Sequence, residues 1–274
     1  MGLVINHNMM AEAAINNLTA TYKSLGESIN ALSSGLRINS ASDDAAGLAV
    51  SEQMKTDIAS ITQGIRNAND GISMLQTFDG AASVIDEKLT RMKELAVQAS
   101  TGTYSSGQRS IMNDEFGAMR DEITRIANAT DFNGIKGLNN SAAITIHFGP
   151  GDSSAEDFYD VTAKNMTASA LGLLELNIGS QASAGAALSV LDSAVTAKDT
   201  ARANFGAMIN RLSNTIANLS IQQQNIQAAE SQVSDVDVAA AMTEMVSKQV
   251  LAQAGISMLA QANSIPMMAL KLLG

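Results

Sequence analysis

A heptad pattern of apolar residues dominates the N-terminal third of this chain and restricts the folds that it can adopt. Apolar side chains recur every three or four residues from Ile58 to Leu75, and after a one-residue shift the pattern continues from Phe78 to Ala96. This spacing is typical of helices that pack side by side. A continuous helix over residues 43–100 would be about 85 Å long at ~1.5 Å per residue. Because a compact chain of 274 residues has a diameter of only roughly 50 Å, the pattern predicts an elongated rod of helices.

Further helices are expected on both sides of this tract, with a short β segment between them. The tracts 18–36 and 112–126 carry the same periodicity, as do 209–226 and 238–259 near the C-terminus. Partial alternation of apolar and polar residues over 142–163 predicts a small β-hairpin instead. The expected fold is therefore mostly α: an elongated rod of antiparallel coiled-coil helices, formed by N- and C-terminal tracts lying side by side, with a β-hairpin insert.

Composition and charge exclude several classes of function. The formal net charge is −10 and the isoelectric point is about 4.6, so the chain has no basic field with which to bind nucleic acid. It contains no cysteine, which excludes disulfides, thiolate metal sites and a cysteine nucleophile. The first residues, MGLVINHNMMAEAA, lack the charged start and continuous apolar core of a cleavable secretory leader. Secretion would therefore use a route that leaves them in place.

The two ends of the chain share an unusual scarcity of charge. Residues 1–36 contain only Glu12, Lys23 and Glu27 as charged side chains, and residues 250–270 contain none. Polar residues and a proline inside the C-terminal tract argue against a membrane-spanning helix, and a membrane-surface helix would carry Lys or Arg. No membrane partner is therefore expected. Because a face of amides and hydroxyls costs less to cover with protein than a charged face, the two ends favour self-assembly.

The expected self-assembly seam consists of apolar heptad positions from both ends of the chain. They are Leu18, Leu25, Ile29, Leu32, Met242, Met245, Ile256 and Leu259. Burial of these side chains against other copies would contribute about 25 cal/mol per Å² of apolar surface. The residues alone leave open whether the copies form an open polymer or the small, closed oligomer expected of a binding module.

One stretch, SSGLRINSASDDAAGLAVSE (residues 33–52), concentrates polar chemistry. Asp43 and Asp44 could bind a metal or act as an acid–base pair, but adjacent helical positions diverge by about 100°. The sequence carries no catalytic or phosphate-binding fingerprint. The stretch is instead interpreted as a joint between two helices, in which Ser42 caps the second helix and both aspartates occupy its first turn. Arg37 is expected to pair with them across the loop. We therefore expect no enzyme activity, no metal and no cofactor.

Three segments of the chain resemble bacterial flagellins. LSSGLRINSASDDAAGLAVSEQM (residues 32–54) and GISMLQTFDGAASVIDEKLTRMKELAVQAS (residues 71–100) are similar to the N-terminal core of that family. AESQVSDVDVAAAMTEMVSKQVLAQAGISMLAQANSIPMMALKLL (residues 229–273) is similar to its C-terminal core. The resemblance implies a structural subunit of the extracellular flagellar filament, which serves swimming motility. A hook–filament junction protein or another flagellar axial protein is the alternative.

The resemblance also implies how the chain is divided. Residues 1–42 with 235–274 would form an inner core, a coiled coil that lines the filament lumen. Residues 43–138 with 180–234 would form a helical outer core, and residues 139–179 a short β-hairpin insert within it, with no large surface domain. The subunit would be secreted into the bacterial flagellum. Its partners would be further copies of itself in a helical homopolymer, a flagellar export chaperone, the filament cap and the hook–filament junction proteins.

By the same resemblance, a host Toll-like receptor would recognise one helix face of the monomer. Arg91, Leu95 and Gln98 fall within the segment that matches the family's recognition site, and Glu115 aligns with a glutamate on the next helix. Positions 90, 92 and 93 depart from the commonest pattern of the family. Because neighbouring subunits would pack on this face, the polymer is expected to hide it.

Overall fold

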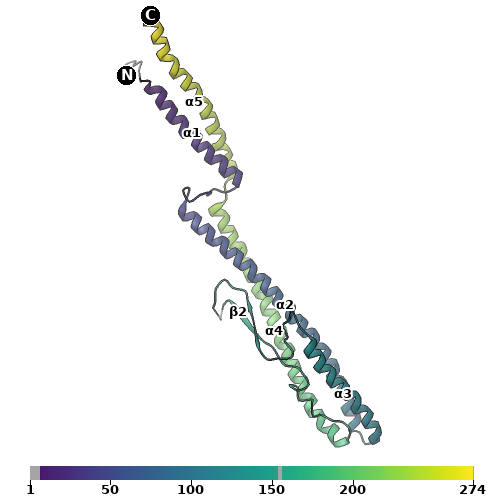
Figure 1. Cartoon of the computed structure of the whole chain (residues 1–274). Helices are drawn as coiled ribbons and strands as arrows, with labels where there is room; N and C mark the ends of the chain where they lie inside the picture. The colour runs from purple at the N-terminus through teal and green to yellow at the C-terminus, as the bar shows by residue number, and fades with distance from the viewer. Residues whose placement is uncertain (1–6, 154–155, 274) are drawn as a thin grey trace. The chain divides into compact units, whose positions relative to one another are not determined.

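The computed structural model describes residues 7–153 and 156–273. The first six residues, which belong to the segment predicted not to be a cleavable leader, lie outside the described residues. In chain order the elements are α1 (Met9–Ser34), α2 (Ala45–Ser100), α3 (Ser106–Ala129), β1 (Ala143–His147), β2 (Phe158–Thr162), α4 (Gln181–Ser234) and α5 (Val238–Leu273) (Figure 1). The chain divides into a terminal unit, residues 1–56 with 225–274, and a central unit, residues 57–224. The predicted fold class of mostly α with a small β-hairpin is confirmed. The boundaries of the predicted inner and outer cores stay predictions.

In the terminal unit, α1 and α5 lie side by side and run in opposite directions (Figure 1). The side chain of Asn8 caps α1 by accepting a hydrogen bond from the amide of Ala11 at 3.1 Å, and its Nδ2 donates to the carbonyl of Ala262 in α5 at 2.9 Å. Further along, Leu18 lies against Gly255, where an added Cβ would be 3.0 Å from the leucine Cδ1. The predicted pairing of the N- and C-terminal tracts is therefore confirmed.

The core of the central unit is built on the heptad positions predicted in α2. The helix runs without a break from Ala45 to Ser100. Its buried side chains include Phe78, Ala82, Ile85, Leu89, Met92 and Ala96. The ring of Phe78 lies 6.4 Å from that of Phe205 in α4, centroid to centroid, and Phe116 of α3 is buried as well. The apolar repeat therefore predicted the buried face of this helix correctly.

Two glycines of α2 allow the β-hairpin to pack closely on that helix. Strands β1 and β2 are antiparallel, from Ala143 opposite Thr162 to His147 opposite Phe158. A Cβ at Gly64 would overlap the backbone carbonyl of Phe148, and a Cβ at Gly71 would lie 2.6 Å from Cδ1 of Ile146. A glycine inside a helix costs about 1 kcal/mol relative to alanine. At these two positions the cost is offset by the burial of the hairpin side chains Ile146 and Phe148.

Ion pairs at heptad spacing join α2 to α4 within the central unit. The pairs are Asp79–Arg202 at 2.8 Å, Asp86–Lys198 at 2.5 Å and Lys93–Asp192 at 2.5 Å. The three α2 members stand seven residues apart, and the last pair has the opposite polarity to the first two. A slip of α4 by one heptad in one direction would place Asp199 opposite Lys93 but the apolar Phe205 and Ile209 opposite Asp86 and Asp79, and a slip in the other direction would lose all three pairs. The pattern therefore favours one register of the two helices.

Lys198 is the most deeply buried member of this set, with 2% of its surface exposed. Its Nζ donates to Oδ1 of Asp86 at 2.5 Å and to Oδ1 of Asp199 at 2.6 Å. Burial lowers the pKa of the ammonium group, but the hydrogen bonds to Asp199 and Asp86 outweigh burial, and the pKa is raised above its ordinary value. The stabilisation from this network is therefore present at neutral pH and is lost only as the pH rises through the raised pKa.

Removal of both carboxylates from Lys198 tests this network. The variant Asp86→Asn, Asp199→Asn leaves a buried ammonium without a counter-charge, and we expect it to lower the free energy of unfolding by about 3 kcal/mol. Adding Lys198→Met removes the charge at similar volume and should recover most of that loss. Denaturant unfolding followed by circular dichroism measures both effects. A triple variant as unstable as the double variant would contradict the role given to the buried charge.

Candidate functional site

The two terminal helices bury few large apolar side chains against each other. Within the described parts of α1 and α5, the buried apolar residues are small: Ala11, Ala252 and Ala262. Five of the predicted seam residues are half-buried, namely Leu18, Leu25, Leu32, Met245 and Leu259. The other three, Ile29, Met242 and Ile256, are exposed. Pairing of α1 with α5 therefore leaves part of the predicted seam open to water.

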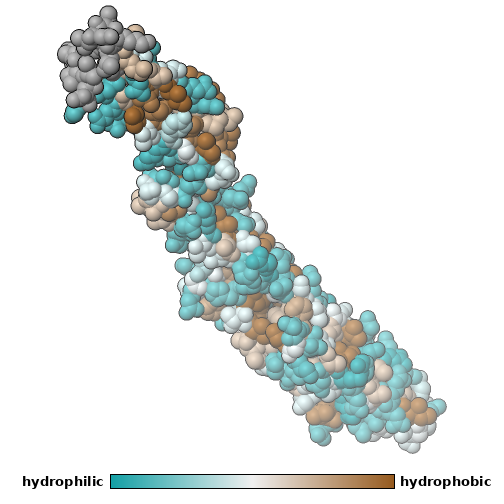
Figure 2. Space-filling view, turned by 45° about the horizontal axis from the view of Figure 1, so that its top comes forward, coloured by the Kyte–Doolittle hydropathy of each residue, from teal (hydrophilic) through white to brown (hydrophobic). Residues whose placement is uncertain are grey.

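More large apolar side chains on the same two helices are also exposed. They are Met9, Met10, Ile15, Tyr22, Val238, Val246, Val250, Leu251, Met258, Met267 and Met268. In Figure 2, hydrophobic surface gathers on the helices at the end of the chain that bears the grey residues. Full burial of a side chain of this size contributes about 1.5–3 kcal/mol. An exposed apolar surface of this extent is typical of a region that other protein covers.

Hydrogen bonds to backbone carbonyls connect the segment after α1 to the end of α4, and we call residues 35–44 together with this end of α4 the joint. Gly35 ends α1 in the left-handed conformation with φ 75°, and its amide donates to the carbonyl of Ala31. Arg37 then donates twice to the end of α4: its backbone amide to the carbonyl of Ser234 and its Nη2 to the carbonyl of Val233, both at 2.6 Å. The expected pairing of Arg37 with the two aspartates is wrong, because the guanidinium reaches the carbonyls that α4 leaves free at its C-terminus.

The predicted cap of α2 is also wrong by two residues. Asp44, directly before the helix, accepts a hydrogen bond from the amide of Gly47 at 2.9 Å, whereas the hydroxyl of Ser42 contacts that of Ser40 at 2.7 Å. Asp43 lies outside the first turn, and its Oδ2 accepts from the amides of Ser40 at 2.9 Å and Asn39 at 3.1 Å. Hydrogen bonds from Ser40 and Asn39 hold the pKa of the Asp43 carboxyl below its ordinary value.

A hydrogen-bonded contact between α2 and α4 in the terminal unit was not predicted from the sequence. Ser51 is 1% exposed, and its hydroxyl donates to Oε1 of Glu230 at 3.2 Å. The same carboxylate oxygen accepts from the hydroxyl of Ser234 at 2.7 Å and lies 4.0 Å from Nζ of Lys55. Glu230 therefore gathers three polar groups at the joint. A serine and a glutamate so far apart in the sequence give no local pattern from which this contact could be found.

The residues predicted for receptor recognition lie together on α2 and α3. Nε of Arg91 donates to Oε1 of Glu115 at 2.9 Å, and Nη1 donates to Glu94 at 3.0 Å. The hydrogen bonds to Glu115 and Glu94 raise the pKa of Arg91. Gln98 donates to the hydroxyl of Tyr104 at 3.0 Å. Leu95 is only 1% exposed, so it supports this face from below instead of presenting a surface to a partner.

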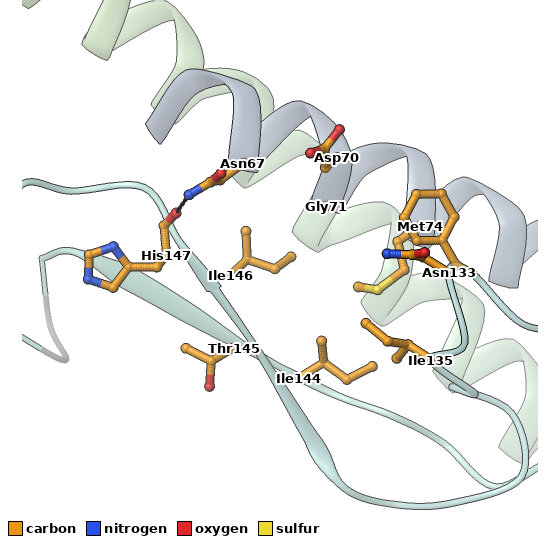
Figure 3. Close-up of a pocket in the computed structure, with 11 residues that line it drawn as sticks. Asn67, Asp70, Gly71, Met74, Asn133, Ile135, Ile144, Thr145, Ile146 and His147 are labelled. Carbon is orange, nitrogen blue, oxygen red and sulfur yellow. Dashed lines mark hydrogen bonds between the residues drawn. The ribbon is translucent and has the colours of Figure 1, made fainter. Parts of the chain in front are cut away.

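A shallow groove of about 540 Å³ lies between α2 and the hairpin in the central unit (Figure 3). Ile144 and Ile146 of β1 face α2, and Nδ2 of Asn67 donates to the carbonyl of His147 at 2.9 Å. Asp70 is the only carboxylate in the lining. Among the described residues, no group of three or more His, Asp or Glu side chains is arranged to hold a metal ion. The groove therefore offers packing surface but no convergent acid–base chemistry.

The comparisons with known proteins decide the family. Residues 5–143 match the model of the bacterial flagellin N-terminal helical region, and residues 188–273 match that of the bacterial flagellin C-terminal helical region. The chain belongs to the bacterial flagellin family. It is 40% identical over 272 residues to a flagellin of Halalkalibacterium halodurans, and the aligned region covers 99% of this chain and 100% of the relative.

Two further comparisons agree with this assignment. A flagellin of Bacillus subtilis is 37% identical over 302 residues, with 98% of this chain and 99% of the relative covered. The crystal structure of a Bacillus cereus flagellin matches with a TM-score of 0.51 and 32% identity, covering 60% of this chain and 94% of that one. Membership of this family confirms the predicted function of a structural subunit of the flagellar filament. In the described part of this flagellin, no helix is both long and apolar enough to cross a membrane.

The lowered pKa of Asp43 predicts an acid-sensitive joint. Because the folded-state pKa lies below the unfolded value, the carboxylate stabilises the joint at neutral pH and stops doing so as the pH falls through the lowered pKa. Asp43→Asn removes this contribution at every pH. We measure the fraction of protein that sediments as polymer for wild type and variant as a function of pH. This fraction should be lower for the variant at neutral pH, and the wild-type and variant values should become equal in strong acid. A difference that stays constant with pH would contradict the role of the carboxylate.

Proposed function

We propose that this flagellin polymerises outside the cell by burying the exposed apolar face of its α1–α5 pair against further copies of the chain. The observation that carries the proposal is the exposure of Ile29, Met242 and Ile256 on two helices that carry only six charged side chains among their 62 residues. The exposed side chains are spread over two helices, so that one part of this surface can meet a different part of it on the next copy, and such a contact repeated head to tail generates an open helical polymer. Apolar burial supplies the driving force.

The regions predicted from the family plan have distinct tasks in this polymer. Residues 1–42 with 235–274 form the inner core that lines the lumen. Residues 43–138 with 180–234 form the outer core, and residues 139–179 form its hairpin insert. The joint residues support this division, because the hydrogen bonds of Arg37, Asp43 and Asp44 fix the path of the chain between α1 and α2.

The same apolar face accounts for the other proposed partners. Before assembly, it needs a cover that prevents premature association, which an export chaperone provides during secretion through the flagellar export apparatus. At each end of an open polymer, the last subunits have one face without a neighbour. The filament cap and the hook–filament junction proteins occupy those two ends.

Charged and polar side chains form the proposed face for the host Toll-like receptor. Arg91, Glu115 and Gln98 lie at the surface of α2 and α3, with the buried Leu95 beneath them. The ion pair Arg91–Glu115 bridges the two helices and holds the guanidinium in one orientation. Recognition requires the monomer, because a neighbouring subunit covers this face in the polymer.

Substitution of two exposed seam residues tests the polymerisation proposal. Ile29→Asn with Ile256→Asn keeps side chains of moderate size but places polar amides in the intersubunit contact. At a cost of about 1.4 kcal/mol or more for each amide, the critical concentration should rise at least about tenfold per substitution. Ile29→Leu with Ile256→Leu is the matched control and should polymerise near the wild-type concentration. Sedimentation and electron microscopy give the readout.

Two results of that experiment would contradict the proposal. One is polymerisation of the asparagine variant at the wild-type critical concentration. The other is a wild-type protein that forms a small, closed oligomer of fixed size, which would favour the alternative of a junction or other axial protein.

A matched pair of arginine variants tests the receptor proposal. Arg91→Ala removes the bridge to Glu115 and should weaken activation of a Toll-like receptor reporter by monomer at least about tenfold, as expected for a charged contact in an interface. Arg125 forms a similar exposed pair with Glu122 at 2.6 Å, so Arg125→Ala is the control and should leave the response unchanged. Equal responses to both variants would exclude Arg91 from the recognition face.

A further inference from the structure

The methionines of this chain are unevenly distributed between its two units. The sequence has 15 methionines and no cysteine. Within the described residues, every methionine that is exposed lies on α1 or α5: Met9, Met10, Met242, Met258, Met267 and Met268. The methionines of the central unit are less accessible. Four are buried, namely Met74, Met92, Met112 and Met166, and two are half-buried, namely Met119 and Met208. The exposed thioethers therefore coincide with the apolar face proposed for polymerisation.

Methionine differs from the other apolar residues of this face in its chemistry. A peroxide transfers one oxygen atom to the thioether sulfur, so that the sulfur is oxidised to a sulfoxide and hydrogen peroxide is reduced to water. The reaction breaks the peroxide O–O bond and forms an S–O bond, with no other reactant. The product is polar and accepts hydrogen bonds, whereas the thioether is apolar and flexible. A seam that depends on apolar burial is therefore weakened by each sulfoxide.

We propose that the six exposed methionines of α1 and α5 form an oxidation site at which peroxide reversibly blocks polymerisation of the free subunit. The proposal rests on the proposed function, because it requires these side chains to be buried between copies. Without cysteine, the chain has no thiol to react first. Methionine sulfoxide is restored to methionine by sulfoxide reductases, which makes the block reversible.

Assembly itself protects the site. In the free subunit, Met258 and Met267 expose 64% and 65% of their surface, so peroxide reaches both. Once copies cover the face, the same side chains are removed from water and react slowly. The buried methionines of the central unit, such as Met92 and Met166, are protected in both states. Oxidation should therefore discriminate between free and assembled flagellin at the terminal helices alone.

The test begins with hydrogen peroxide treatment of full-length monomer and of preformed filaments, followed by peptide mass spectrometry. In the monomer, sulfoxide should appear at the six exposed methionines at a dose at least about tenfold below that required in the central unit. In filaments, the six should react at least about tenfold more slowly. Equal rates at these methionines in monomer and filament would overturn the proposal.

The second step measures polymerisation of the oxidised monomer. Its critical concentration should rise at least about tenfold, and treatment with methionine sulfoxide reductases should return it to the untreated value. Replacing all six with leucine should abolish the effect of peroxide, whereas the control Met119→Leu with Met208→Leu should remain sensitive. Oxidised wild type that polymerises normally would overturn the proposal, as would oxidised protein that reductase does not rescue.

The untreated sample separates this proposal from the proposed function. If untreated wild type does not polymerise, the function assigned to the terminal helices fails. If it polymerises and oxidation has no effect, only the oxidation site fails. The reductase rescue uses the wild-type chain, so the conclusion does not depend on whether the six-leucine variant folds.

Discussion

The pairing of α1 with α5 is the constraint on which the rest of this flagellin depends. Two helices alone can bury only the stripe that faces the partner, and here that stripe contains the alanines Ala11, Ala252 and Ala262. Large apolar side chains on the remaining surface stay in contact with water. The scarcity of charge on the same helices lowers the cost of covering part of their surface with protein. In the proposed polymer, neighbouring copies supply the apolar contacts that one copy lacks.

The central unit follows the opposite principle, because it is complete within a single chain. Phe78, Leu89 and their heptad neighbours are buried among α2, α3 and α4, and charges at heptad spacing select one register. The hairpin packs closely on α2 at Gly64 and Gly71. A unit with its own buried core can keep the same packing before and after assembly. A unit with a complete core beside a unit with an open apolar face is the division that the proposed polymerisation needs.

Sequence patterns predicted the helices, the hairpin and the buried face of α2, because each depends on a local apolar period. They were less successful wherever a contact joins residues distant in sequence. Arg37 binds the carbonyls at the end of α4 and not the nearby aspartates, and Glu230 reaches Ser51 without any local pattern. The choice between Ser42 and Asp44 as the cap depended on where α2 begins, and helix ends are poorly determined by periodicity.

Helical reconstruction of the native filament at side-chain resolution would show whether the exposed apolar face of α1 and α5 is buried between subunits. The quantity to measure is the environment of Ile29, Met242 and Ile256, which are exposed in the single chain. We predict that all three lie within about 4 Å of apolar atoms from neighbouring subunits, while amide and hydroxyl side chains of α1 and α5 face the lumen. A filament in which these three side chains remain in contact with water would contradict it.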